Sequence, residues 1–362
     1  MSSSNEDIKF AYWVPNVSGG LVVSNIEQRT GWDLDYNTRL AQAAENNGFD
    51  YALSQIRFTA GYGAEYQHES VAFSHALLAV TKRLKVIAAV LPGPWHPVVV
   101  AKQLATIDQL TGGRVSVNVV SGWFKGEFTA IGEHWLEHDE RYRRSEEFIS
   151  ALKGIWTQDS FTMKGDFYRF NEYTLKPKPL QQPHPEIFQG GNSAAARRMA
   201  ARVSDWYFMN GNSLENHKAQ IDEIREAAAA LGRRVKFGVN AFVVARDTEA
   251  EARQVLADII GQANVEAVHA FGDAVRQAGQ AAPEKQGMWA NSKFEDLVQY
   301  NDGFKTGLIG TPRQIAEKIV ALKAIGVDLV LTGFLHFVEE VEYFGRNVLP
   351  LIRELEQQRA AA

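Results

Sequence analysis

Short apolar segments rich in β-branched residues alternate along almost the whole chain with segments whose apolar residues recur about every 3.6 positions. The first pattern predicts buried strands and the second predicts amphipathic helices. The predicted strands cover residues 9–15, 50–56, 84–92, 114–122, 186–191, 205–211, 235–246 and 328–336. The predicted helices cover residues 36–47, 69–82, 96–110, 140–157, 194–203, 214–231, 248–261, 312–325 and 339–356. Eight strand–helix units in series predict an α/β chain that closes into a (β/α)8 TIM barrel.

Residues at the element boundaries agree with this division. Thr311 followed by Pro312 predicts a helix N-cap with proline at the first helical position, and Gly326 predicts the end of that helix. Two insertions interrupt the alternation. We predict a hairpin and a proline-rich connector at about 160–185, and a mobile, lid-like loop rich in Gly, Ala and Gln at about 264–306. No shift in composition marks a second domain, so residues 1–362 are expected to form a single barrel domain.

Composition narrows the class of protein. The 362 residues are 45% hydrophobic and 22% charged, carry a net charge of -5 and include no cysteine. A polyanion needs a concentrated basic face, which this sequence lacks, so nucleic acid is not an expected partner. No apolar run is long enough to span a membrane, and the first eleven residues do not resemble a secretory signal. We therefore expect a cytoplasmic protein with no disulfide and no thiolate chemistry.

In a TIM barrel the active site lies at the carboxyl ends of the strands, so residues at those positions are the first candidates. They include aromatic, amide and cationic side chains but few acidic ones. This set suits a large planar ring held by hydrogen bonds better than it suits a metal ion. The candidates are Trp13, Gln55, Arg57, Asn118, Ser121, Gly190, Gly191, Asn192, Ser193, Asn210, Asn240 and His336.

The stretch EIFQGGNSAAARRMAARVSD, residues 186–205, takes an apolar strand through two glycines into a helix. Glycines permit close approach to the backbone, and the free amides at a helix N-terminus bind anions. A plain tight turn between strand and helix explains the same residues equally well. From these residues alone, an anion site and a structural turn remain equally good interpretations.

Two further motifs point to other chemistry. His134 and His138 match the H-x-x-E-H pattern of zinc peptidases, which requires both histidines on one helical face. Asp139 predicts that the helix starts after them, so the match is interpreted as chance. Gly61 and Gly63 resemble the start of a dinucleotide fingerprint, but Tyr66 occupies the position of its third glycine.

Four longer stretches carry a resemblance to a known family. They are PGPWHPVVVAKQLATIDQLTGGR at 92–114, VSGW at 120–123, HDERYRRSEEF at 138–148 and QGGNSAAA at 189–196. Together they resemble the bacterial luciferase-like, flavin-dependent monooxygenases over essentially the whole chain. The stretches at 10–24, 55–63 and 331–351 resemble the members of that family that oxidise dimethyl sulfone.

The resemblance implies an enzyme that uses reduced FMN, supplied by a separate NADH-dependent FMN reductase, with O₂ as co-substrate. It implies cleavage of a carbon–sulfur bond of the sulfone to give methanesulfinate and formaldehyde, and a homotetramer. It places the flavin phosphate at Gly190, Gly191, Asn192 and Ser193 with Tyr142, and the ribityl chain and ring at Gln55, Asn118 and Ser121. The anion in the 186–205 stretch is then the phosphate of the cofactor. His336 is the expected acid/base group and Arg57 the expected sulfonyl donor.

The expected substrate pocket departs from that of the related alkanesulfonate monooxygenases. Positions that resemble their strand-seven arginine and histidine and their strand-eight tyrosine hold Asn240, Phe242 and Phe334. Because burying an unpaired anion is costly, loss of the cations favours a neutral substrate held between Trp13, Asn240, Phe242 and Phe334. Three alternatives remain: alkanesulfonate desulfonation, a barrel that binds a flavin without catalysis or uses a deazaflavin for hydride transfer, and zinc-dependent hydrolysis through His134 and His138.

Overall fold

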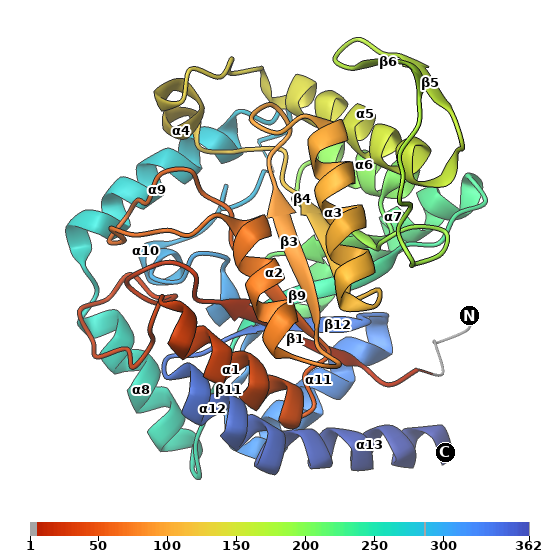
Figure 1. Ribbon diagram of the computed structural model, residues 1–362. Coiled ribbons are helices and arrows are strands. Elements are labelled where there is room, and N and C mark those ends of the chain that lie inside the picture. The colour runs from red at the N-terminus through yellow and green to blue at the C-terminus, as the bar shows by residue number, and fades with distance from the viewer. Residues whose placement is uncertain (1–5, 286, 362) are drawn as a thin grey trace.

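The computed structural model describes residues 6–285 and 287–361. Within them, eight parallel strands form a closed barrel in the order β1-β12-β9-β8-β7-β4-β3-β2. These strands are β1 (Lys9–Val14), β2 (Tyr51–Ser54), β3 (Lys85–Val90), β4 (Val115–Val119), β7 (Ile187–Gly190), β8 (Trp206–Met209), β9 (Lys236–Phe242) and β12 (Leu329–Gly333). The predicted (β/α)8 barrel is confirmed, and Figure 1 shows the helices arranged around the strands.

The helices of the outer layer follow the strands in sequence. They are α1 (Leu34–Asn46), α2 (Ser70–Val80), α3 (Pro97–Thr111), α5 (His138–Thr157), α6 (Ala194–Val203), α7 (Leu214–Ala230), α8 (Glu249–Gly261), α11 (Pro312–Ile325), α12 (Phe337–Tyr343) and α13 (Leu349–Ala361). A π-helical turn at Phe344–Val348 joins the last two, so the helix predicted at 339–356 is divided in two. The predicted caps are confirmed: Thr311 accepts a hydrogen bond from the Gln314 backbone amide, and Gly326 ends α11 with a φ of 104°.

Side chains alternate between the two faces of each barrel strand, as the pleat requires. On β12, Leu329 and Leu331 belong to the small cluster that fills the barrel interior, whereas Val330 packs in the larger outer core between strands and helices. Phe188 and Trp206 stack inside the barrel with ring centroids 5.0 Å apart. The barrel is therefore filled by side chains below its open end.

Glu186 closes the floor of the barrel, directly before β7. Its carboxylate accepts hydrogen bonds from Tyr51 Oη at 2.9 Å, Trp206 Nε1 at 2.9 Å and Lys85 Nζ at 3.1 Å. Burial alone would raise the pKa of this carboxyl, but Lys85 and the hydrogen bonds lower it overall. One ionised side chain thus links β2, β3 and β8 across the floor of the barrel.

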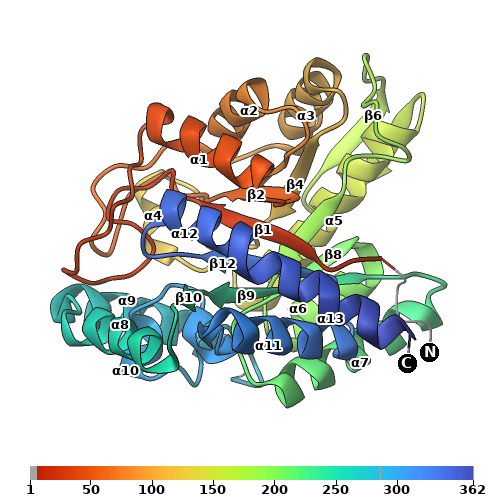
Figure 2. The same ribbon diagram turned by 90° about the horizontal axis from the view of Figure 1, so that it is seen from below.

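The first insertion has the predicted form. Strands β5 (Phe161–Lys164) and β6 (Arg169–Tyr173) pair antiparallel as a hairpin, separate from the barrel. Figures 1 and 2 both place this hairpin at the outer edge of the molecule, beside α5.

The strand predicted at 235–246 ends earlier in the structure, so its predicted C-terminal end is wrong. Strand β9 leaves the barrel after Phe242, and Val244–Ala245 forms a separate strand, β10, that pairs with β11 (Ile309–Gly310). The continuous apolar sequence hid this break, because both strands are buried and therefore look alike in composition.

The prediction of a loop at 264–306 is also wrong, because much of this segment is helical. This segment contains α9 (Val265–Gln280), the short α10 (Phe294–Leu297) and a 3₁₀ turn at Gly303–Thr306. Val268, Phe271 and Val275 form the buried face of α9. Their helical spacing was visible in the sequence but was outweighed by the surrounding Gly, Ala and Gln. In Figure 2, α9 and α10 lie together with α8 at one end of the molecule.

Candidate active site

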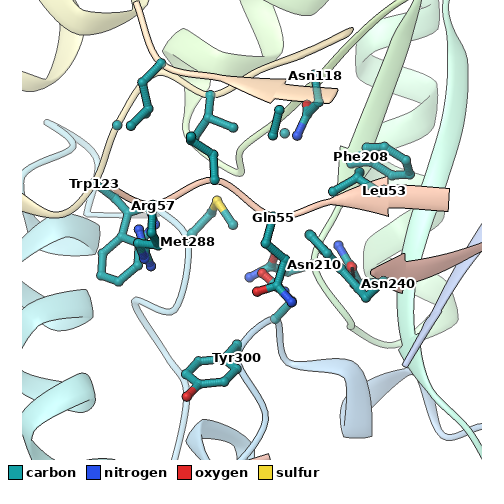
Figure 3. A pocket seen from close by; sticks show the side chains of 18 of the residues that line it. Leu53, Gln55, Arg57, Asn118, Trp123, Phe208, Asn210, Asn240, Met288 and Tyr300 are labelled. Carbon is teal, nitrogen blue, oxygen red and sulfur yellow. Dashed lines mark hydrogen bonds between the residues drawn. The ribbon is translucent and has the colours of Figure 1, made fainter. Parts of the chain in front are cut away.

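A cavity lies at the carboxyl ends of the barrel strands, between the strand loops and the segment 264–306 (Figure 3). Its side-chain amides and its serine hydroxyl come from Gln55, Gln67, Asn118, Ser121, Asn210, Asn240 and Asn301. Its aromatic wall consists of Trp13, Tyr62, Trp123, Tyr142, Phe208, Phe271, Trp289 and Tyr300. This composition, a few polar groups in an apolar wall, is typical of a site for a large organic ligand.

Two amides of the cavity are held in place by other groups. Asn240 accepts a hydrogen bond from Trp13 Nε1 at 2.9 Å and donates one to the Met209 carbonyl at 3.1 Å. Gln55 donates to the Val14 carbonyl at 3.2 Å. These contacts fix the orientation of each amide, so the remaining polar atoms point in defined directions.

Asn118 and Ser121 present buried atoms without partners. Asn118 Oδ1 and Ser121 Oγ make no hydrogen bond with any residue that the structure describes. Buried polar atoms are almost always satisfied, so an unpaired pair beside a cavity indicates a ligand. Both residues were predicted from the sequence, and Figure 3 shows Asn118 at the edge of the cavity. The polar edge of a flavin offers the groups that would satisfy them.

The turn between β7 and α6 has the backbone geometry of an anion site. Gly191 has a φ of 144°, and an added Cβ would lie 2.6 Å from Ala196 Cβ and 2.9 Å from Tyr142 Oη. Ser193 is the N-cap of α6 and accepts a hydrogen bond from the Ala196 amide. Burial raises the pKa of Tyr142, although a hydrogen bond with Ser193 opposes the shift. The Tyr142 hydroxyl therefore keeps its proton and remains a donor.

Glu284, from the second insertion, already presents an anion to this turn. Its Oε1 accepts a hydrogen bond from the Ala194 amide, in the first turn of α6, at 2.6 Å. The contact shows that this helix end accepts a carboxylate, as helix N-termini do. A phosphate presents equivalent oxygen atoms, so the residues at the turn fit the phosphate of FMN. Gly190 lines the cavity, whereas Asn192 lines a separate hollow beside it.

Arg57 and Glu127 bring charge to the cavity. The Arg57 guanidinium lies 4.3 Å from the centre of the Trp123 ring, and its Nη1 is 3.9 Å from Glu127 Oε2. Burial lowers the pKa of Arg57, and the negative charge of Glu127 opposes the shift. Figure 3 shows Arg57 beside Trp123 and Met288 on one side of the cavity. The sequence predicted Arg57 but not Glu127.

His336 lies outside the cavity lining. It precedes α12, and its Nδ1 accepts a hydrogen bond from the Arg29 amide at 3.2 Å. Burial is the main cause that lowers the pKa of His336, so the ring is neutral and its Nδ1 serves as an acceptor. The geometry therefore gives no support to the acid/base role expected from the sequence.

Phe242 and Phe334 also lie outside the lining. Phe334 points away from the barrel interior and packs against Phe337 in the outer core. Its place follows from strand alternation, because it has the same parity as the outward-facing Val330. Phe242 packs edge-on against Phe304, at 5.2 Å, so the second insertion covers it. Trp13 and Asn240, the other two residues expected to hold the substrate, do line the cavity.

Several aromatic cavity residues were missed because they belong to loops or to the second insertion. Phe271 on α9 contacts Tyr62, Trp123, Trp289 and Tyr300 through ring pairs 5.3–5.9 Å apart. Their signal in the sequence was a set of large aromatics in segments otherwise rich in small residues. Such residues seldom occur in a loop that packs against nothing.

His134 and His138 are not arranged as zinc ligands. His134 precedes α5, while His138 begins it and places Nδ1 2.6 Å from Asp139 Oδ1. The predicted helix start was two residues late, since Glu137 rather than Asp139 is the N-cap. Across residues 6–285 and 287–361, no cluster of three His, Cys, Asp or Glu side chains is suited to a metal ion. In the same ranges, no helix is both long and apolar enough to cross a membrane.

Comparison of the sequence with known proteins identifies its family. Residues 8–329 match the family model described as luciferase-like monooxygenase. The chain is 77% identical over 358 residues to an FMNH₂-dependent dimethylsulfone monooxygenase of Pseudomonas putida, covering 99% of each. It is 74% identical over 359 residues to the enzyme of the same name from Pseudomonas fluorescens strain Pf0-1, covering 99% of this chain and 98% of that one.

Solved structures agree on the fold. The crystal structure of a long-chain alkane monooxygenase matches with a TM-score of 0.80, covering 98% of this chain and 92% of that chain at 20% identity. At this identity the likeness extends to the barrel alone. The family match spans most of the residues that build the barrel and the cavity, and the Pseudomonas relatives cover nearly the full length. The chain belongs to the luciferase-like monooxygenase family.

Proposed function

We propose that this chain is the oxygenase of a two-component system that uses FMNH₂ and O₂ to oxidise dimethyl sulfone. The observation that carries the proposal is the identity with the P. putida dimethylsulfone monooxygenase along nearly the whole chain. The chemistry of the cavity agrees with this proposal, because its lining is largely apolar and also contains several side-chain amides. A small uncharged sulfone needs hydrogen-bond donors for its oxygens but no net cation.

The cofactor fits the polar end of the cavity. We assign the phosphate to the β7–α6 turn, at Gly190, Gly191, Asn192 and Ser193, with the Tyr142 hydroxyl as a further donor. We assign the ribityl chain and ring to Gln55, Asn118 and Ser121, because two of these three residues carry unpaired buried oxygens. Reduced FMN, when bound, supplies the two electrons with which O₂ oxidises the sulfone.

The protein holds the substrate and excludes water. We propose that Arg57 donates to a sulfonyl oxygen, since its guanidinium lines the cavity while its face rests on Trp123. Trp13 and Asn240, joined by their hydrogen bond, form one wall. Leu53, Phe208 and Leu331 supply the apolar surface that the sequence had assigned to Phe242 and Phe334. The aromatic cluster around Phe271 shields the cavity from bulk water.

The proposed reaction balances without another reactant. Dimethyl sulfone, O₂ and FMNH₂ give methanesulfinic acid, formaldehyde, water and oxidised FMN. One oxygen atom enters the methyl carbon that leaves as formaldehyde, and the other becomes water. The carbon–sulfur bond breaks with its electron pair on sulfur, so sulfur leaves as the methanesulfinate anion, and the hydroxyl on the departing carbon loses its proton as formaldehyde forms.

Two further parts of the proposal concern partners. A separate NADH-dependent FMN reductase supplies the reduced flavin, which agrees with the incomplete dinucleotide fingerprint at Gly61 and Gly63. The homotetramer implied by the family resemblance and the cytoplasmic location stay predictions. Light scattering of the purified protein measures the first, and fractionation of cells measures the second.

A single-turnover assay tests the function. The protein is mixed with photoreduced FMN and then with oxygenated buffer containing dimethyl sulfone, and formaldehyde and methanesulfinate are quantified. We expect one formaldehyde and one methanesulfinate for each sulfone consumed, and no formaldehyde when the sulfone is left out. Methanesulfonate under the same conditions is the control. Faster consumption of methanesulfonate would replace the proposal with alkanesulfonate desulfonation. O₂ uptake that yields only hydrogen peroxide, with no formaldehyde from the sulfone, would favour a non-oxygenase flavin protein.

A further inference from the structure

The charged residues of the cavity form a single pair. Of the described residues that line it, Arg57 is the one cation and Glu127 the one anion, and the others are neutral amides, hydroxyls, aromatics and aliphatics. The two residues come from different parts of the fold, since Arg57 follows β2 and Glu127 lies on the short helix α4 (Lys125–Ala130). The net charge of the lining is therefore zero.

Backbone amides hold the Glu127 carboxylate in place. Its side chain is 2% exposed, and its Oε1 accepts hydrogen bonds from the Phe58 amide at 2.5 Å and the Thr59 amide at 3.3 Å. Oε2 is left facing Arg57. One oxygen thus anchors the loop that carries Arg57, and the other balances the charge of Arg57.

The surroundings of Arg57 leave its donors available to a ligand. The Nη1–Oε2 distance of 3.9 Å is too long for a hydrogen bond, so the two groups interact through charge alone. Trp123 covers one face of the guanidinium. The side chain is 23% exposed, and that exposed part opens on the cavity. Arg57 can donate hydrogen bonds there while its charge is already balanced.

We propose that Glu127 determines the charge of the substrate: it balances Arg57, so that the cavity accepts a neutral sulfone and disfavours anionic sulfonates and sulfinates. This inference rests on the proposed function, because it assumes that the sulfone binds near Arg57. The same balance speeds release of product. The reaction turns a neutral sulfone into an anionic sulfinate, which finds no net positive charge to hold it. A lone buried arginine would retain that anion.

The test is the isosteric variant Glu127→Gln, which keeps an acceptor for the Phe58 amide and removes the negative charge. Methanesulfonate, methanesulfinate and dimethyl sulfone are titrated calorimetrically into the full-length protein, with and without saturating FMN. We expect affinity for both anions to rise by about tenfold to a hundredfold relative to the sulfone, the range for an unbalanced charge in a partly buried site. Inhibition of turnover by methanesulfinate should strengthen in parallel.

Glu340→Gln is the matched control. Glu340 Oε2 accepts hydrogen bonds from the Leu335 and His336 amides, while Oε1 lies 2.8 Å from Arg246, so it repeats the arrangement of Glu127 outside the cavity. This variant should leave the preference for the sulfone unchanged. Glu127→Asp, which keeps the charge, should also keep that preference. Glu127→Met gives the same comparison if the glutamine variant does not fold.

The outcomes separate the two proposals. An unchanged ratio of anion to sulfone affinity in Glu127→Gln overturns the role of Glu127, even if the wild-type protein oxidises the sulfone. Weaker FMN binding with no change in that ratio also overturns it, because the pair would then serve the flavin. If the wild-type protein fails to consume dimethyl sulfone while Glu127→Gln gains anion affinity, the proposed function fails and the charge balance stands.

Discussion

The Glu284 carboxylate and the Ala194 amide are joined by a 2.6 Å hydrogen bond, so the second insertion places a negative charge on the first turn of α6. This is the turn that we assign to the phosphate of FMN. Two anions at one helix end compete for the same amides and repel each other. We therefore expect this bond to form in the flavin-free protein and to break when the cofactor binds.

Replacing Glu284 with glutamine should tighten FMN binding. We expect an affinity about threefold to tenfold higher, with a weaker dependence on salt, because the competing charge is removed. Quenching of flavin fluorescence on titration measures it. Riboflavin, which has no phosphate, should bind the variant and the wild type equally, and Glu295→Gln on the exposed face of α10 is the control substitution. An equal gain for riboflavin would contradict the competition.

Gly191→Ala should destabilise the protein and weaken FMN binding. The backbone at Gly191 has a φ of 144°, and the new Cβ would approach Ala196 Cβ to 2.6 Å. Strain of this kind costs about 1–3 kcal/mol. Thermal melts followed by circular dichroism measure the loss. At Gly190 an added Cβ would find its nearest neighbour at 3.5 Å, so Gly190→Ala should melt close to the wild type. Equal melting temperatures for the two variants would show that the turn tolerates a side chain.

His336→Ala should leave the chemistry nearly unchanged. A general acid or base contributes about a hundredfold or more to the rate, whereas His336 lies outside the cavity lining and its Nδ1 is bonded to the Arg29 amide. We expect single-turnover rates within about twofold of the wild type. Loss of the hydrogen bond should cost about 1 kcal/mol of stability.

Arg57→Met in the same single-turnover assay provides the contrast, with a large loss in the rate of sulfone oxidation. A loss in His336→Ala as large as that in Arg57→Met would restore the histidine to the reaction.

Acid should destabilise the protein through His217. Burial lowers the pKa of His217, and its hydrogen bond to the Asn210 carbonyl opposes part of this shift. The folded protein therefore holds the ring neutral at pH values where the unfolded chain protonates it. The free energy of unfolding that depends on neutral His217 is fully present above about pH 6.5. It is lost as the pH falls below that value, because the unfolded state then binds a proton that the folded state does not.

Urea unfolding at about pH 7.5 and about pH 5.5 measures this loss. His217→Asn should reduce the difference between the two pH values, whereas His269→Asn at an exposed site should not. An identical difference in all three proteins would assign the acid sensitivity to other groups. Because Asn210 lines the cavity, we also expect ligand affinity to follow the same pH dependence.

The sequence predicted the barrel because its signals are local. Strand periodicity, the Thr311 cap and the Gly326 stop each depend on residues within one or two turns of the chain. The same holds for the β7–α6 turn, where two glycines, a small polar cap and a helix follow one another. The position of Phe334 could also have been predicted locally. It lies four positions after the outward-facing Val330, so strand alternation places both side chains on the same outer face.

The parts that the sequence did not reveal depend on distant residues. Glu127 is separated from Arg57 by two strands and two helices, and nothing near it indicates its partner. Phe242 was misplaced because Phe304, more than sixty positions later, covers it. In 264–306, the α9 pattern was short and surrounded by small residues. Packing between remote segments, which no local pattern encodes, decided all three.

Side chains around Glu186 and the stacked rings of Phe188 and Trp206 fill the lower part of the barrel, and the cavity lies above them at the carboxyl ends of the strands. We expect FMN, O₂, the sulfone and the products to enter and leave at that end, so the order in which they bind should affect turnover. A large ligand that binds first restricts the access of a smaller one to the cavity. A product that stays bound prevents the next turnover. We expect steady-state kinetics to reveal an obligatory sequence of entry and exit.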